Sequence, residues 1–287
     1  MIKKNLPYIF IFDIDNCIIG DVSYVLYEND ILELIRKECE KKKLSLKCPK
    51  MINFKKDLNQ GLLRPYFKDF IKFIKKKYKK VEIYVYTNST YSWTHNGLVY
   101  NIEKAANIKF NKPYFTRENS FKNFEKSLTN VYNIIINNLN KKYPLLKKKI
   151  YINEVFNNNI IFIDDIKDNL ADHRYKQLVC PKYEYIKSYN ILNKIIKEYK
   201  IEKKKLMKNE EIYQYIISNY EIIMNFKNKS LLNKLIPLYS EKMYKEKKYY
   251  EKLNKKDKFF KNLIKILKKE KTNNLNNKLI NKLNKII

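Results

Sequence analysis

Short apolar runs alternate with charged, helix-patterned stretches over the first two thirds of the chain. Four runs rich in β-branched and aromatic residues predict strands, at 8–12, 81–87, 160–163 and 177–180. Apolar residues also recur on one face of a helix expected over 65–79, namely Phe67, Phe70, Ile71 and Ile74. Further helices are expected over 120–141 and 29–43. Lone apolar strands separated by helices are typical of a mostly parallel sheet with helices on both faces, so we expect an α/β fold.

The pattern changes near residue 188. No glycine occurs beyond this point, and Pro237 is the single proline. Apolar residues recur at helical spacing with lysines on the opposite faces, as in Ile191, Ile195, Ile196 and Tyr199. We therefore expect an α/β domain over 1–188 and a basic helical region over 189–287, with roughly the last 15 residues fraying. The apolar stripe predicts a packing face, either on the first domain or within a small bundle, in preference to a nucleic-acid or membrane surface.

Composition allows a substantial core and adds an extreme charge. Hydrophobic residues make up 45% of the 287 residues, which excludes global disorder, and the formal net charge is +31. Such a charge attracts polyanions, whether nucleic acid, an anionic membrane surface or an acidic protein. The alternative explanation is coding bias toward Lys, Asn and Ile in an AT-rich genome. In that case much of the charge lies on solvated faces and binds nothing.

The cysteines exclude two classes of site. None of Cys17, Cys39, Cys48 and Cys180 forms a C-x-x-C pair, and only two histidines are present, which argues against structural zinc. None begins a C-x5-R loop, so a phosphatase with a cysteine nucleophile is excluded. Free thiols predict a reducing intracellular compartment, cytoplasm or nucleus. We expect neither a signal peptide nor a transmembrane segment.

Two acidic pairs follow two of the predicted strands. Asp13 and Asp15 come just after the first strand, and Asp164 and Asp165 come just after the third. Like charges this close raise each other's pKa or need a cation between them. An Asp nucleophile, an Asp acid/base and a metal ion together would explain the arrangement.

The second strand ends in polar residues that could bind a phosphate. Thr87, Asn88 and their neighbours offer hydroxyl groups and backbone N–H groups at the carboxyl end of a strand. A lysine is needed nearby to offset the phosphate charge. We favour Lys126, placed early on the helix before the third strand, over Lys112 and Lys122.

The order strand-DxD, strand-(T/S), Lys, strand-DD resembles the haloacid dehalogenase-like (HAD) phosphohydrolase superfamily. Within it, the stretch Leu63-Arg64-Pro65-Tyr66-Phe67-Lys68-Asp69-Phe70, followed by Ile83-Tyr84-Val85-Tyr86-Thr87-Asn88-Ser89-Thr90, resembles the NLI-interacting-factor-like group. That group includes the phosphatases of the RNA polymerase II C-terminal domain. The resemblance covers roughly residues 7–186. It departs at Cys17, where Thr or Val is usual, in the long spacing from Lys126 to Asp164, and after Asp165.

The resemblance implies a HAD-like Rossmannoid sheet with a minimal cap or none, and Mg²⁺-dependent phosphomonoester hydrolysis through an aspartyl-phosphate. Asp13 would be the nucleophile, Asp15 the acid and base, and Lys126 the charge-neutralising group, while Thr87 and Asn88 would bind the phosphate. Mg²⁺ would be held by Asp13, the backbone carbonyl of Asp15, and Asp164. Asp165 or Asp168 would hold its waters or orient the lysine.

The expected substrate follows from the sizes of the insertions. The gaps after the first and second motifs hold no full cap, and an open site favours a phosphorylated macromolecule, with phosphoserine/threonine protein first. A polynucleotide end phosphatase is the second enzymatic hypothesis. A catalytically inactive HAD-fold binding or scaffold protein, with polyanion binding by the basic helical region, is the non-enzymatic one.

Overall fold

A computed structural model of the chain describes residues 6–22, 54–121, 125–185, 245 and 248–287. The chain forms two compact units: one of Met1–Gly20, Asp57–Glu184 and Asn254–Ile287, and a second of Asp21–Lys56 and Tyr185–Leu253. The helix expected over 29–43 and the pattern between 190 and 244 lie outside the described residues.

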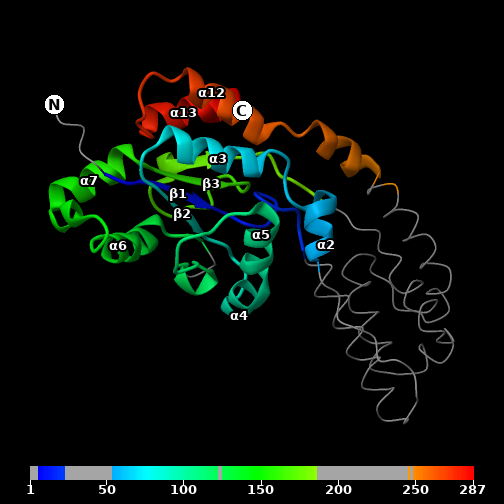
Figure 1. Cartoon of the computed structure of the whole chain (residues 1–287), viewed down its shortest axis with the longest axis horizontal. Helices are drawn as coiled ribbons and strands as arrows, with labels where there is room; N and C mark the ends of the chain where they lie inside the picture. The colour runs from blue at the N-terminus through cyan, green and yellow to red at the C-terminus, as the bar shows by residue number, and fades with distance from the viewer. Residues whose placement is uncertain (1–5, 23–53, 122–124, 186–244, 246–247) are drawn as a thin grey trace, which may run out of the picture. The chain divides into compact units, whose positions relative to one another are not determined.

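A four-stranded parallel sheet forms the centre of the first unit (Figure 1). Its order is β2-β1-β3-β4, with bounds Tyr8–Phe12 for β1, Val81–Val85 for β2, Ile160–Asp164 for β3 and Gln177–Val179 for β4. All four predicted strands are confirmed. Phe12 pairs with Val85 on one side and Ile163 on the other, so three strands end at the same level.

The α-helices with both ends described are α2 (Lys55–Asp57), α3 (Phe67–Lys77), α4 (Tyr91–Trp93), α5 (Val99–Ala106), α6 (Leu128–Leu139), α7 (Lys149–Asn158), α12 (Phe259–Lys269) and α13 (Asn277–Ile286), and residues 248–256 are also helical. The helix predicted over 65–79 corresponds to α3. The helix predicted over 120–141 corresponds to the shorter helix α6. It begins at Leu128 because the Ser127 hydroxyl accepts the Asn130 N–H and caps its first turn. The helices α2, α4, α5 and α7 were not predicted.

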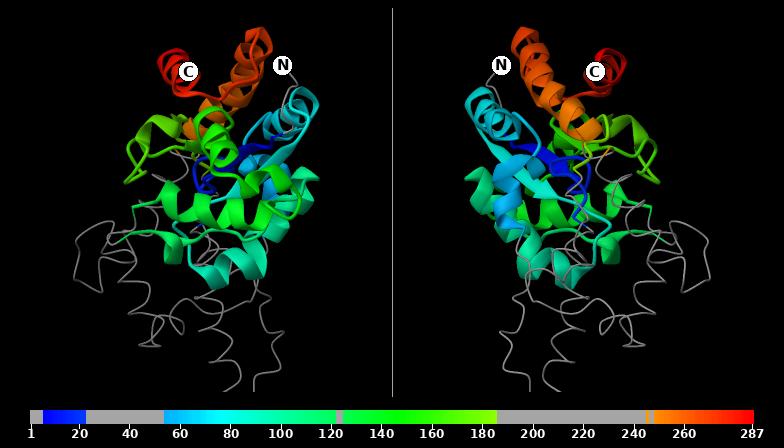
Figure 2. Two further views of the ribbon diagram at one scale, coloured as in Figure 1. Left: turned by 90° about the vertical axis from the view of Figure 1, so that its left-hand side faces the viewer. Right: turned by 90° about the vertical axis from the view of Figure 1, so that its right-hand side faces the viewer.

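Alternate residues of the strands pack into two separate cores. Ile9 and Ile11 belong to a buried cluster with side chains of α6 and α7, including Leu128, Val131, Ile135 and Val155. Phe10 and Phe12 face the other way, and their ring centroids lie 6.1 Å and 6.2 Å from that of Phe70 on α3. The side views separate the two layers of helices on either side of the sheet (Figure 2). The expectation of an α/β fold with helices on both faces is therefore confirmed.

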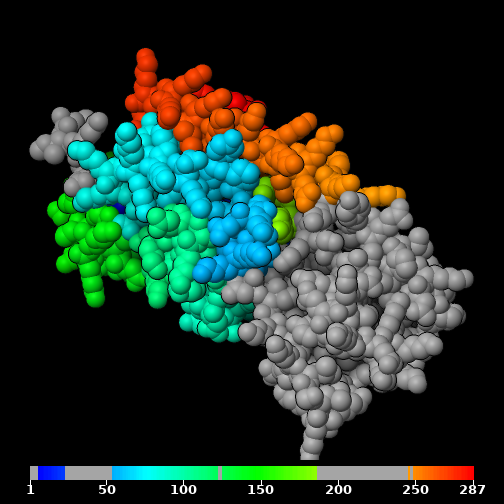
Figure 3. Space-filling model, turned by 45° about the vertical axis from the view of Figure 1, so that its right-hand side comes forward, coloured from blue at the N-terminus to red at the C-terminus, as the bar shows by residue number. Residues whose placement is uncertain are grey.

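Of the two packing faces expected for the helical region, the C-terminal segment Asn254–Ile287 uses the one on the first unit. Phe260 of α12 is fully buried, with its ring centroid 5.2 Å from those of Phe67 and Phe70. At the edge of the sheet, Asn284 accepts the Val179 N–H at 2.8 Å and donates to the Gln177 carbonyl at 2.8 Å. The space-filling view shows this segment, orange to red, lying directly against α3 (Figure 3).

The last residues of the chain also differ from expectation. Fraying was expected over roughly the last 15 residues, but Asn277–Ile286 forms a helix whose first turn is capped by Asn276, which accepts the Leu279 N–H. Burial of the apolar stripe Leu279, Ile280 and Leu283 explains the order, because low-complexity sequence still forms a helix when one face is packed. In the part of the chain that the structure describes, no helix is long and apolar enough to cross a membrane.

Replacing Phe260 tests whether α12 is part of the sheet unit's core. We expect Phe260→Ala to lower the free energy of unfolding by about 3–5 kcal/mol, because it empties a site between α3 and β1. Denaturant titration followed by circular dichroism measures the change. Ile286→Ala is the matched control, since Ile286 is 58% exposed and its replacement should cost less than about 0.5 kcal/mol. Equal effects of the two substitutions would contradict the packing.

Candidate active site

The acidic and polar residues singled out in the sequence meet at the carboxyl edge of the sheet. Asp13 directly follows β1, Asp164 ends β3 and Thr87 comes two residues after β2. Asp13 continues the alternation of Ile9 and Ile11, so its side chain lies on the face of the sheet that α6 covers. The parallel register and the two-residue period of the strands therefore bring these side chains together.

Lys126 lies between the two strand-end aspartates. Its Nζ is 2.6 Å from Asp13 Oδ1 and 2.8 Å from Asp164 Oδ2, and the residue is 1% exposed. The lysine was expected early on a helix, but it lies in an extended segment that ends at the cap of α6. Its backbone accepts the Ala171 N–H and donates to the Asn169 carbonyl, which holds it against the segment that follows β3.

The two alternative lysines have different surroundings. Lys112 places its ammonium group 6.0 Å from the ring centroid of Tyr114. Lys122 lies outside the described residues. Lys126 is thus the lysine that the described part of the chain brings to the aspartates.

Three carboxylates could hold a metal ion. Asp13, Asp164 and Asp165 each offer an oxygen, and these oxygens lie within 4.8 Å of one another. Asp164 is fixed in place, because its carboxylate accepts the Ile166 N–H at 2.8 Å and the Asn169 side-chain amide at 2.9 Å. Oxygen ligands suit hard cations such as Mg²⁺ and Ca²⁺, so the donor set fits a cation of this class. The Asp15 carboxylate is not one of these three ligands, and binding through the Asp15 backbone carbonyl stays a prediction.

Burial and charge perturb the titration of this cluster. Burial raises the pKa of Asp13 well above its ordinary range; Lys126 opposes this effect, while Asp164 and Asp15 add to it. Burial, with a contribution from Asp164, raises the pKa of Asp165 to about 6. Burial disfavours the charge of Lys126, but Asp13 and Asp164 outweigh it and raise the pKa of the lysine. The lysine is therefore charged, and a further cation would favour the ionised carboxylates.

Two hydroxyl groups hold Asp15. Ser89 Oγ donates to Asp15 Oδ2 at 3.1 Å, and Thr87 Oγ1 donates to the same oxygen at 3.5 Å. Thr87 is 1% exposed, and its hydroxyl also accepts the Ser89 N–H at 3.2 Å. Asn88 is turned toward another segment, since its Oδ1 accepts from Ser120 Oγ and its carbonyl accepts from Arg117 Nε. Thr87 therefore lies beside the acidic residues, whereas the Asn88 side chain contacts the 116–120 segment.

Three supporting residues were not singled out from the sequence. Ser89 orients Asp15, Asn169 orients Asp164, and Asp172 accepts the Leu128 and Thr129 N–H groups at the start of α6. Ser89 was visible as a second hydroxyl two residues after Thr87. Asn169 follows Asp164 by only 5 residues and could have been found as a neighbour of the acidic pair, whereas nothing local marks Asp172, because its partner Leu128 is 44 residues away in the chain.

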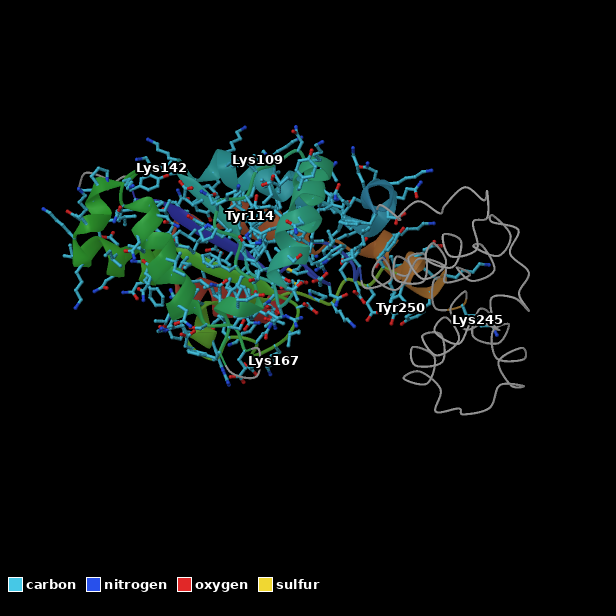
Figure 4. All side chains as sticks on the ribbon, turned by 90° about the horizontal axis from the view of Figure 1, so that it is seen from below. Lys109, Tyr114, Lys142, Lys167, Lys245 and Tyr250 are labelled. Atoms are coloured by element: carbon cyan, nitrogen blue, oxygen red, sulfur yellow. The ribbon has the colours of Figure 1, made fainter. Side chains whose placement is uncertain are left out.

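The turn after Asp164 separates inward from outward side chains. Asp165 is partly buried in the metal-ligand cluster, whereas Lys167 is exposed and lies at the rim of the ribbon (Figure 4). Asp168, which was weighed as an orienting residue, is exposed and has a left-handed φ of 59°. Of the two, Asp165 is the one that joins the cluster.

Comparison with known proteins identifies no relative: no protein-family model matches the chain, and no curated protein or solved structure matches it either. The chemistry of the site therefore rests on its own geometry. A buried carboxylate beside an ammonium group, a further pair of carboxylates and an acid held by two hydroxyls can together bind and attack an anionic electrophile.

The pH dependence of stability tests the electrostatics of the cluster without any substrate. The pKa of Asp165 is about 6 in the folded protein against an ordinary value of 3.8, so between these values the folded state keeps a proton that the unfolded state has lost. Stability in the presence of a chelator should therefore fall as pH rises from about 4 to about 6, and this contribution should stay constant above that range. Thermal unfolding across this range measures the slope.

Two variants isolate the contribution of Asp165. Asp165→Asn should make the slope less steep and leave the part that Asp13 contributes, whereas Asp69→Asn, at an exposed position on α3, should leave it unchanged. Added Mg²⁺ at neutral pH should raise the melting temperature of the unchanged protein, because a bound cation favours the ionised carboxylates. Identical slopes for all three proteins would show that Asp165 does not titrate in this way.

Proposed function

We propose that the chain is a Mg²⁺-dependent phosphomonoester hydrolase that acts through an aspartyl-phosphate on Asp13. The observation that carries the proposal is the buried Lys126 ammonium between Asp13 and Asp164, with the Asp165 carboxylate beside them. A buried ion pair maintained for stability alone would be balanced, because uncompensated buried charge is expensive. Here three carboxylates face one ammonium group, and the excess negative charge suits a divalent cation.

Asp13 is the nucleophile in this proposal. One carboxylate oxygen is held by Lys126, which leaves the other to attack phosphorus while the ester P–O bond breaks. Asp15 donates a proton to the departing oxygen, and then removes a proton from the water that attacks the aspartyl-phosphate. Inorganic phosphate leaves, and Asp13 and Asp15 return to their initial protonation states.

The remaining residues set geometry and charge. Thr87 and Ser89 hold the Asp15 carboxylate at one oxygen and so fix its orientation for proton transfer. Lys126 places a fixed positive charge beside the transferring phosphoryl group, where negative charge is spread over the equatorial oxygens. Mg²⁺ held by Asp13, Asp164 and Asp165, with the Asp15 carbonyl, would neutralise further charge on those oxygens.

The substrate class stays a prediction from the sequence. A macromolecular substrate was inferred from short insertions, yet the chain after the first acidic pair contributes Asp21–Lys56 to a second compact unit with Tyr185–Leu253. The positive net charge of +31 still favours an anionic macromolecule. Phosphoserine/threonine protein is therefore the first substrate to test, and a polynucleotide 3′- or 5′-phosphate the second.

Hydrolysis of p-nitrophenyl phosphate tests the proposed chemistry. We expect turnover that requires Mg²⁺, and a loss of about 10³-fold or more in Asp13→Asn, because an amide oxygen is a poor nucleophile. Asp69→Asn, which changes an exposed aspartate on α3, is the matched control and should keep full activity. Metal-independent turnover, or equal rates in Asp13→Asn and the unchanged protein, would overturn the proposal.

A substrate comparison separates the two enzymatic hypotheses. With Mg²⁺ present, kcat/KM should be higher for phosphoserine and phosphothreonine peptides than for 3′- or 5′-phosphorylated oligonucleotides. Asp13→Asn is the control for both substrates, since contaminating phosphatases would survive the substitution. A preference for oligonucleotides would replace the first hypothesis by the second.

A further inference from the structure

A buried arginine lies behind the loop that carries Asp13 and Asp15. Arg64 is 1% exposed, and its guanidinium group lies 4.7 Å from the ring centroid of Phe259 and 5.4 Å from that of Tyr183. A cation in an apolar, aromatic environment must be compensated by hydrogen bonds and an opposite charge. The partners of Arg64 therefore show why the charge is kept.

One side of the guanidinium group contacts the loop. Arg64 Nη1 donates to the Cys17 carbonyl at 3.1 Å, and the Arg64 backbone N–H donates to the Ile18 carbonyl at 3.0 Å. Cys17 lies two residues after Asp15. The arginine thus holds the backbone immediately behind the proposed acid and base from two directions, through side chain and main chain.

The other side of the guanidinium group is held by the C-terminal segment. Asp257 Oδ2 accepts from Arg64 Nη2 at 2.8 Å, and Asp257 Oδ1 accepts from Arg64 Nε at 3.3 Å. A forked pair of this kind fixes the plane and position of an arginine more tightly than a single contact does. Asp257 lies two residues before α12, so its position depends on the packing of that helix against α3.

Further bonds hold the same region from neighbouring segments. Tyr183 donates its N–H to the Asn16 carbonyl and its hydroxyl to the Gly61 carbonyl, and the Gly20 N–H donates to the Leu62 carbonyl. Asn254 donates to the Glu184 carbonyl at 2.6 Å. The chain leaves and rejoins the first unit at Gly20, Asp57, Glu184 and Asn254. Hydrogen bonds therefore connect the three chain segments of the first unit near their ends, around the loop of residues 13–20.

We infer that Arg64 and Asp257 are positioning residues, and that the C-terminal segment Asn254–Ile287 completes the site by holding the loop of residues 13–20 in register with Asp164 and Lys126. The inference rests on the proposed function for its catalytic consequence. Its structural consequence, the fixed backbone of the loop, is independent of any activity. Misplacement of reacting groups by about 1 Å can cost on the order of 100-fold in rate, so a loosened loop should act on turnover.

Asp257→Asn is the first test, because it keeps the shape of the side chain and removes the charge that fixes Arg64. We expect kcat to fall by about 10- to 100-fold while KM changes by less than about 3-fold, since the loop carries the reacting groups. Amide hydrogen exchange of the peptide that covers 13–20 should become faster. Its Ile18 and Ile19 N–H groups donate to the Ile14 carbonyl, and they report on the loop directly.

Lys77→Met is the matched control. The Lys77 ammonium group donates to the carbonyls of Leu267 and Glu270 at the end of α12, so it also fastens the C-terminal segment but does not contact the loop. This variant should lower the melting temperature while leaving kcat and the exchange of 13–20 unchanged. Equal effects of Lys77→Met and Asp257→Asn on kcat and exchange would overturn the inference in favour of a general loss of stability.

Asp257→Glu provides a second variant in case Asp257→Asn does not yield folded protein. It keeps the charge but displaces it by one methylene, so exchange of 13–20 should again exceed that of Lys77→Met, by less than in Asp257→Asn. Exchange identical to the unchanged protein in every Asp257 variant would overturn the inference. If no protein shows turnover but exchange responds as expected, the proposed hydrolysis fails and the positioning role stands.

Discussion

The arrangement of the site depends on one buried ammonium group between two carboxylates. Lys126 reaches Asp13 and Asp164 at 2.6 Å and 2.8 Å, at a place with almost no access to water. Burial of three like charges would otherwise oppose folding, because each carboxylate loses hydration and repels the others. The lysine offsets part of this repulsion, and the excess negative charge that is left makes the cluster a place for a hard cation.

That interaction requires three segments to meet at one edge of the sheet. The carboxyl ends of β1 and β3 supply the aspartates, and the segment before α6 supplies the lysine while its backbone pairs with residues 169–171. The α6 helix is in turn anchored by Asp172, which accepts N–H groups of its first turn. The position of Lys126 between the aspartates is therefore tied to the start of α6.

The opposite face of the sheet serves the site less directly. Aromatic side chains of β1, α3 and α12 form its core, and the packing of α12 brings Asp257 to Arg64 behind the loop of residues 13–20. The pattern of the C-terminal segment left open whether it packs on the first domain or within a separate bundle, because lysine-rich amphipathic helices carry no mark of the surface against which they pack. Only tertiary contacts, such as those of Phe260 with Phe67 and Phe70, decide where the segment packs.

The sequence by itself determined the four strands and the residues at their ends, since short apolar runs and the acidic pairs after them are local features. It also pointed to Lys126 as one of three candidates. Only the tertiary structure decided that Lys126 bridges Asp13 and Asp164, that Ser89 joins Thr87 on Asp15, and that Arg64 pairs with Asp257 about 193 residues away. The physical reason is that a strand or helix follows from nearby residues, whereas the partner of a buried charge follows from packing between distant ones.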